Sequence, residues 1–84
     1  MIINLYAIRD LKMGKYFTPF QAINNEVAKR MLSSNVNDKT KGNNLYEFTE
    51  DFQLYKVAEY NEDTAEFTTI TEFIANATEF KKEN

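Results

Sequence analysis

The fold is decided by Phe52-Gln53-Leu54-Tyr55-Lys56-Val57-Ala58-Glu59-Tyr60, followed by Asn61-Glu62-Asp63-Thr64 and then Ala65-Glu66-Phe67-Thr68-Thr69-Ile70. Aromatic and β-branched residues dominate both arms, and the four residues between them are polar turn formers. This pattern predicts a β-hairpin. In the first arm, strict alternation places Phe52, Leu54, Ala58 and Tyr60 on one face and Tyr55 and Val57 on the other. The arm is apolar on both sides, so we expect it to be a central strand.

The N-terminal part of the chain is predicted to form a second hairpin and a helix. Alternating apolar residues predict a strand over residues 2–9, and the pattern resumes over 16–23 after a short turn. Pro19 has no amide hydrogen to donate, so the second strand is expected at a sheet edge. Asn24-Asn25 can cap a helix, and the apolar stripe that follows predicts one over residues 25–35. A helix of about ten residues is unstable alone and must dock on the sheet.

The remaining segments are less regular. Residues 36–51 are polar apart from a few apolar side chains, and they predict a long surface loop. Apolar residues between positions 70 and 80 fall at helical spacing and predict a short C-terminal helix, followed by a frayed tail over 81–84. The sequence therefore predicts one α+β domain over residues 1–84, in which a small antiparallel ββαββ sheet packs one face on a helix.

The composition excludes several classes of function. The chain has no Cys and no His, so it lacks the usual zinc ligands, nucleophilic thiols and near-neutral bases. We therefore expect no enzymatic activity, no metal site and no cofactor. The apolar run at the N-terminus contains Asn4 and stops at Arg9-Asp10, so neither a signal peptide nor a membrane span is predicted. The expected location is the cytoplasm.

Charge is distributed unevenly along the chain. Residues 1–42 carry seven basic and three acidic side chains, a net charge of +4, whereas residues 43–84 carry three basic and ten acidic ones, a net charge of −7. The overall charge of −3 argues against a general polyanion binder, but the basic half could still contact one.

Basic and aromatic side chains cluster in the predicted first hairpin. The set comprises Tyr6, Arg9, Lys12, Lys15, Tyr16 and Phe17. Cations that meet phosphates, beside rings that stack on bases, are what a site for single-stranded nucleic acid requires. Lys29 and Arg30, on the outer face of the predicted helix, would extend the same patch. A hairpin with solvated lysines and core aromatics also explains these residues, and spacing alone favours that second interpretation.

Four carboxylates surround the predicted turn of the central hairpin: Glu59, Glu62, Asp63 and Glu66. They lack the alternating oxygen ligands and the glycine of an EF-hand loop, which favours a solvated turn over a cation site. The rival to nucleic-acid binding is a protein-interaction module in which this acidic half binds another protein.

The aromatic content predicts self-association. Twelve Phe and Tyr rings are many for a domain of 84 residues to bury, and the predicted sheet must have edges. We therefore expect a homodimer, formed through an edge strand or through the apolar segment 73–80.

The ordered blocks of the chain resemble those of one family. The blocks are Leu5-Tyr6-Ala7-Ile8-Arg9-Asp10, the Pro19-Phe20 pair with Asn24-Asn25 after it, the short helix, and Asp51-Phe52-Gln53-Leu54-Tyr55 with its acidic hairpin. Their order and spacing, over about residues 3–70, resemble the small nonstructural protein of gokushovirus-type microviruses, which are phages with circular single-stranded DNA genomes. Ala58 and Ala65 depart from the pattern, because glycines are expected at both positions.

The resemblance implies a nonstructural phage protein that binds single-stranded DNA during viral DNA replication or genome packaging, in the cytoplasm of a bacterial host. It supplies no catalytic residue. On this interpretation the phosphate contacts come from Arg9, Lys12, Lys15, Lys29 and Arg30, and the stacking rings are Tyr16 and Phe17.

Overall fold

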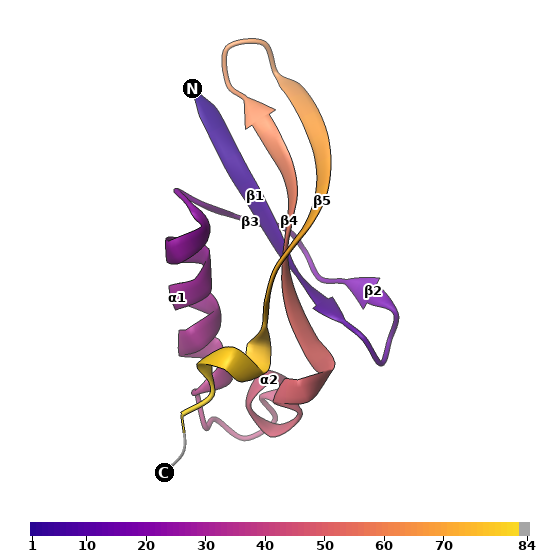
Figure 1. Ribbon diagram of the computed structural model, residues 1–84, viewed down its shortest axis with the longest axis vertical. Helices are drawn as coiled ribbons and strands as arrows, with labels where there is room; N and C mark the ends of the chain where they lie inside the picture. The colour runs from indigo at the N-terminus through magenta and orange to yellow at the C-terminus, as the bar shows by residue number, and fades with distance from the viewer. Residues whose placement is uncertain (83–84) are drawn as a thin grey trace.

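The computed structural model describes residues 1–82 and has the predicted α+β class. Its elements are β1 (Ile2–Asp10), β2 (Lys15–Tyr16), β3 (Phe20–Ala22), α1 (Asn25–Val36), the one-turn helix α2 (Asn44–Glu47), the 3-10 helix η1 (Thr49–Asp51), β4 (Phe52–Asn61), β5 (Glu66–Asn76) and the 3-10 helix η2 (Ala77–Phe80). The antiparallel sheet has the order β2-β1-β4-β5, and β3 pairs with β1 beside β2 (Figure 1).

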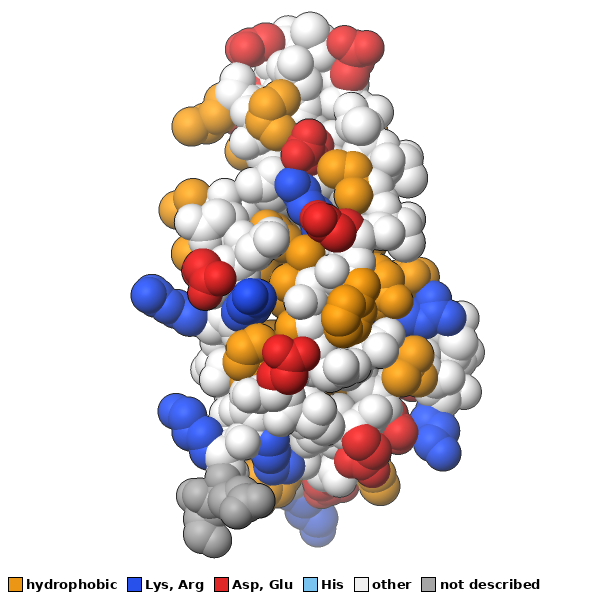
Figure 2. All heavy atoms as spheres, in the orientation of Figure 1, with side chains coloured by type: hydrophobic (Ala, Val, Ile, Leu, Met, Phe, Trp, Pro, Cys, Tyr) orange, Lys and Arg blue, Asp and Glu red, His pale blue; other side chains and the backbone are white. Residues whose placement is uncertain are grey.

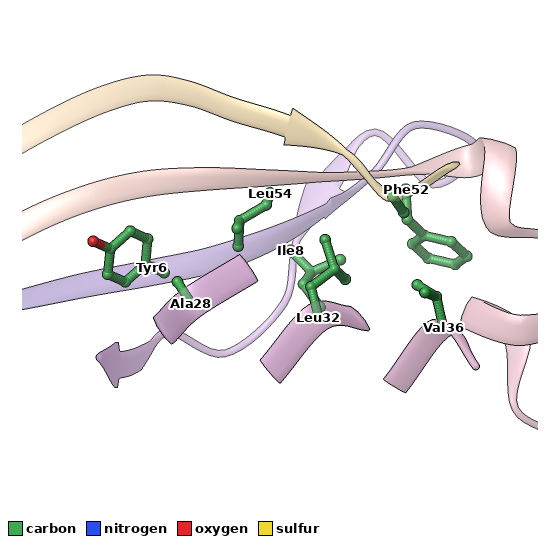
Figure 3. Close-up of a cluster of buried hydrophobic side chains, with 8 residues drawn as sticks. Tyr6, Ile8, Ala28, Leu32, Val36, Phe52 and Leu54 are labelled. Carbon is green, nitrogen blue, oxygen red and sulfur yellow. The ribbon is translucent and has the colours of Figure 1, made fainter. Parts of the chain in front are cut away.

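One face of the sheet is covered by α1, as predicted (Figure 1). Buried side chains from β1 and β4 meet the apolar stripe of the helix in a single core (Figure 3), which consists of Tyr6, Ile8, Ala28, Leu32, Val36, Phe52, Leu54 and Ala77. The helix begins where the sequence predicts, because the Asn24 side chain accepts a hydrogen bond of 2.9 Å from the Val27 amide. We call the sheet face opposite α1 the open face.

Tyr6 connects the central strand β1 to the start of the helix α1 through a hydrogen bond. Its ring is fully buried, and its hydroxyl donates a 2.6 Å hydrogen bond to Oδ1 of Asn25. Burial raises the pKa of the Tyr6 hydroxyl, because removal from water disfavours the phenolate. The side chain is therefore a core residue and not part of the predicted basic and aromatic set.

The hairpin of β4 and β5 is confirmed, and β4 is a central strand. Its predicted faces need a correction. In the pairing with β1, Leu5 lies opposite Ala58 but Tyr6 lies opposite Lys56, so Val57 is an extra residue. This β-bulge reverses the alternation, and Ala58 and Tyr60 lie on the open face with Tyr55 rather than with Leu54.

The predicted C-terminal helix over residues 70–80 is wrong. Strand β5 continues to Asn76, opposite Gln53, and only η2 turns helically. Threonine, isoleucine and phenylalanine dominate β5, and these residue types favour a strand. Two register shifts between β4 and β5 interrupt the alternation of inward and outward side chains along β5. Because of these interruptions, the apolar residues of the strand fall at a spacing that resembles that of a helix.

The predicted second strand over residues 16–23 is divided, so the simple ββαββ order is also corrected. Pro19 separates β2 from β3, because it has no amide hydrogen to donate to the ladder. Both pieces pair with β1 at the sheet edge, in register Arg9 with Tyr16 and Leu5 with Gln21.

The predicted loop over residues 36–51 is more ordered than the sequence indicates, because it contains α2 and η1. The Asn37 side chain donates hydrogen bonds to the carbonyls of Ser33 and Phe80 and accepts one from the Lys82 amide. The Lys81 ammonium donates to the carbonyl of Tyr46. Residues 81 and 82 of the predicted frayed tail are thus held against the loop, whereas 83 and 84 lie outside the described residues.

The first prediction concerns the core of the hairpin. Leu54 is fully buried against the helix, so Leu54→Ala should lower the free energy of unfolding by about 2 to 5 kcal/mol. Leu11→Ala, the same change at an exposed turn position, should cost no more than about 0.5 kcal/mol. Urea unfolding followed by circular dichroism measures both. A loss at Leu54 as small as that at Leu11 would place the core elsewhere.

The second prediction concerns the two alanines that stand where glycines are expected. Ala65 has a φ of 62°, in the left-handed region that disfavours a side chain, whereas Ala58 lies within β4. Ala65→Gly should raise the free energy of unfolding by about 0.5 to 1 kcal/mol by removing this strain. Ala58→Gly should lower it by a similar amount, because glycine weakens a strand interior. Changes of the same sign in thermal denaturation would contradict this assignment.

Candidate nucleic-acid interface

The turn between β1 and β2 fixes the position of the predicted basic residues. The Asp10 carboxylate is buried and accepts hydrogen bonds from the amides of Lys12 (2.9 Å) and Met13 (3.1 Å). Gly14 closes the turn with a φ of 68°, which glycine adopts without strain. Lys12 and Lys15 are both exposed at this end of the sheet.

Arg9 and Tyr16 form a pair on the open face. They lie opposite each other in the β1–β2 ladder. Nη1 of Arg9 donates a 2.9 Å hydrogen bond to the Tyr16 hydroxyl, and the guanidinium carbon lies 5.0 Å from the centre of the Tyr16 ring. This is cation–π geometry. It holds a positive charge directly beside a ring that is 37% exposed.

The Tyr16 ring begins a row of three aromatic side chains across the open face, which we call the aromatic row: Tyr16, Tyr55 and Phe73. The ring centres of Tyr16 and Tyr55 are 5.5 Å apart at 86°, and those of Tyr55 and Phe73 are 5.7 Å apart at 75°. Edge-to-face contacts of this kind fix the rings relative to one another. Phe73 is 46% exposed, so the row presents apolar ring surface to solvent.

The Tyr16 and Tyr55 rings can meet because β1 contributes a small residue between them. Ala7 lies opposite Tyr55 in the ladder and is buried. Its methyl group leaves the Tyr16 and Tyr55 rings free to meet across the strand. The sequence pattern does not indicate Tyr55 or Phe73 as site residues. Alternation in residues 52–60 predicts an interior position in a central strand for Tyr55. Helical spacing predicts a helix around Phe73, and a helix would have no register with Tyr55.

The structure separates the other predicted site residues from this pair. Phe17 follows Tyr16 and points to the opposite face, where its ring lies 5.9 Å from that of Phe52. Lys29 and Arg30 lie on α1, which packs against that same opposite face, and Lys29 is 3.5 Å from the Glu26 carboxylate. Of the predicted set, Arg9 and Tyr16 meet on the open face. Lys12 and Lys15 are exposed at the adjoining end of the sheet, where Lys15 pairs with Asp10 and alternates to the other face from Tyr16.

The four carboxylates of the rival site gather around the far end of the β4–β5 hairpin, and two of them have partners. Glu59 accepts from Lys56 at 2.8 Å, a hydrogen bond that raises the pKa of the lysine. Asp63 lies 3.1 Å from the N-terminal ammonium of Met1. Figure 2 shows acidic side chains at this upper end, whereas the basic ones lie mostly over the lower half of the molecule.

Residues 1–82 show neither a candidate metal site nor a pocket. No group of three potential ligands among them could hold a metal ion. No helix in this part of the chain is long and apolar enough to cross a membrane. The open face is where exposed rings and a cation meet.

Comparison with known families identifies the chain as a phage protein. The model of the Phage ORF5 protein family matches residues 3–80. This match spans nearly the whole chain, so the protein belongs to the Phage ORF5 protein family, and the predicted phage origin is confirmed at that level. No curated protein and no solved structure matches the chain.

Proposed function

We propose that the open face of the sheet binds single-stranded DNA. The observation that carries this proposal is the aromatic row, exposed beside the guanidinium of Arg9. Exposed rings on a sheet provide stacking surface that accepts any base, at about 1 to 3 kcal/mol per base. Duplex DNA keeps its base faces inside the stack, so the single strand should be preferred.

The phosphate contacts come from the end of the row where β1 turns into β2. Arg9 lies on the open face, and the exposed Lys12 and Lys15 lie at the adjoining turn, from which their long side chains would reach a bound strand, whereas Lys29 and Arg30 lie on the helix behind the sheet. The predicted set of five cations is thereby reduced to three for a strand bound on the open face. With two or three phosphates in contact and a coefficient of about −0.7 per phosphate, log K should fall against log salt with a slope of about −1.5 to −2.

The charge distribution also limits where the strand can lie. Glu62, Asp63 and Glu66 at the hairpin tip would repel a phosphate chain. The strand therefore crosses the lower part of the sheet, over the aromatic row, and does not run along β4 and β5 to the tip. The negative net charge of the chain keeps the affinity moderate.

Family membership supports the biological setting of the proposal. A phage protein that resembles the nonstructural protein of gokushovirus-type microviruses would meet single-stranded genomes in the cytoplasm of its bacterial host. We therefore place the binding in viral DNA replication or genome packaging, as a non-enzymatic activity.

The third prediction tests the stacking residues. Tyr55→Ala and Phe73→Ala should each weaken binding to a fluorescein-labelled oligothymidylate about 5- to 150-fold, which corresponds to about 1 to 3 kcal/mol. Phe48→Ala removes an equally exposed ring from the α2 region, outside the row, and should leave the affinity unchanged. Fluorescence anisotropy measures the affinity, and thermal melts confirm that each variant is folded. Equal losses at Phe48 and Tyr55 would show that binding is not confined to the row.

The fourth prediction separates the two groups of cations. Arg9→Ala should make the salt slope shallower by about 0.7, because one phosphate contact is lost. Arg30→Ala removes the same charge from the helix and should leave the slope as it is. If the wild-type protein shows no association with single-stranded DNA at about 50 mM salt and tens of micromolar protein, DNA binding is ruled out. The acidic half as a site for a host or viral protein then becomes the leading alternative.

A further inference from the structure

We infer that Gln53 and Asn76, which we call the amide pair, bind the Watson–Crick edge of a base that stacks on the aromatic row. The inference rests on the DNA binding proposed above and adds hydrogen-bonding residues to that site. It is carried by the register of the strands, by the hydrogen bond between the two side chains and by the polar groups that this bond leaves free.

The amide pair lies on the open face beside the aromatic row. Gln53 is opposite Arg9 in the β1–β4 ladder and opposite Asn76 in the β4–β5 ladder. Residues that face each other across a ladder point to the same side of the sheet, so both amides share the face of Arg9. Gln53 precedes Tyr55 by two residues, a distance of about 7 Å along β4. A base stacked on the Tyr55 ring can therefore direct its edge at the amide pair.

The two amides are joined in one arrangement. Nε2 of Gln53 donates a 3.0 Å hydrogen bond to Oδ1 of Asn76. The backbone amide of Asn76 donates a 2.8 Å hydrogen bond to the Glu79 carboxylate, which holds Asn76 at the end of β5. The bond between the side chains leaves Oε1 of Gln53 as an acceptor and Nδ2 of Asn76 as a donor. Within residues 1–82 neither of these two atoms has another partner.

An acceptor and a donor on adjoining amides match the edge of any unpaired base. Adenine, cytosine, guanine and thymine each carry a donor and an acceptor side by side on the Watson–Crick edge. Proteins that bind single strands form hydrogen bonds with these edges while the base stacks on a ring. In a duplex the same edges are paired with each other. The amide pair therefore recognises that a base is unpaired without fixing which base it is.

The charges on either side of the amide pair favour the same orientation of the strand. Arg9 lies on the β1 side of Gln53, and the exposed Glu79 carboxylate lies beside Asn76. Phosphates are attracted to the guanidinium and repelled by the carboxylate. The backbone of the bound strand therefore lies toward β1, and its bases extend over β4 and β5, where the amide pair is located.

The fifth prediction compares an oligothymidylate with the same oligonucleotide made from N3-methylthymine, which keeps the ring and the phosphates but loses the donor at N3. The wild-type protein should bind the methylated strand about 2- to 10-fold more weakly, as expected for the loss of one hydrogen bond. Gln53→Leu should bind the unmodified strand more weakly by a similar factor and should bind both strands equally. Its salt slope should be unchanged, because no phosphate contact is lost. Fluorescence anisotropy measures all four affinities.

The matched control is Gln21→Leu. Gln21 is exposed opposite Leu5 in the β1–β3 ladder, away from the aromatic row and the amide pair, so this variant should keep the wild-type preference for the unmodified strand. Circular dichroism shows whether each variant is folded, and Gln53→Thr replaces Gln53→Leu if that variant is not.

Two results overturn the inference while leaving DNA binding intact. One is equal binding of the two strands by the wild-type protein. The other is a wild-type preference retained by Gln53→Leu, which is expected if the amide pair only joins β4 to β5. If the wild-type protein binds neither strand, the proposed DNA binding fails, and the inference fails with it.

Discussion

A single short helix can cover only one face of this sheet, and the rest of the structure depends on that limit. A helix about 10 Å wide spans roughly two strands spaced about 4.8 Å apart. In this protein the two strands are β1 and β4, whose side chains Tyr6 and Leu54 are fully buried beneath α1 (Figure 3). The opposite face keeps its aromatic side chains in contact with solvent, and the edge strands β2 and β5 lie at the margin of the core. The helix thus determines both the interior and the surface that remains for binding.

The open face is ordered although no helix covers it. Ala7 leaves space above β1, and the edge-to-face contacts of the aromatic row hold its rings in place. Arg9 is fixed at one end of the row by its hydrogen bond to Tyr16. A preorganised protein surface loses less conformational entropy when a flexible single strand binds to it. This order distinguishes the row from a single exposed apolar residue such as Ile23, which is 82% exposed.

Local sequence patterns predicted the elements that depend on local chemistry. The central hairpin, the strand β1 and the helix capped by Asn24 follow from residue type and spacing, and the structure confirms them. The errors come from features set by pairing between distant segments. The bulge at Val57 moves Ala58 and Tyr60 to the other face, and the register of β4 with β5 extends the strand through a segment with apparent helical spacing. The same limit applies to the candidate site. Tyr16 and Phe17 are adjacent in sequence but lie on opposite faces, whereas Tyr55 and Phe73 join Tyr16 in one row only through the order of the strands.

Nuclear magnetic resonance of the amides during titration with a short oligothymidylate tests most directly which face binds DNA. Binding on the open face predicts shifts that concentrate at Arg9, Tyr16, Tyr55 and Phe73 and at the β1–β2 turn. Amides of α1 around Lys29 and Arg30, and those of the hairpin tip around Glu62, should change little. Shifts centred on α1 or on the hairpin tip, or no shifts at saturating oligonucleotide, would contradict a DNA site on the open face.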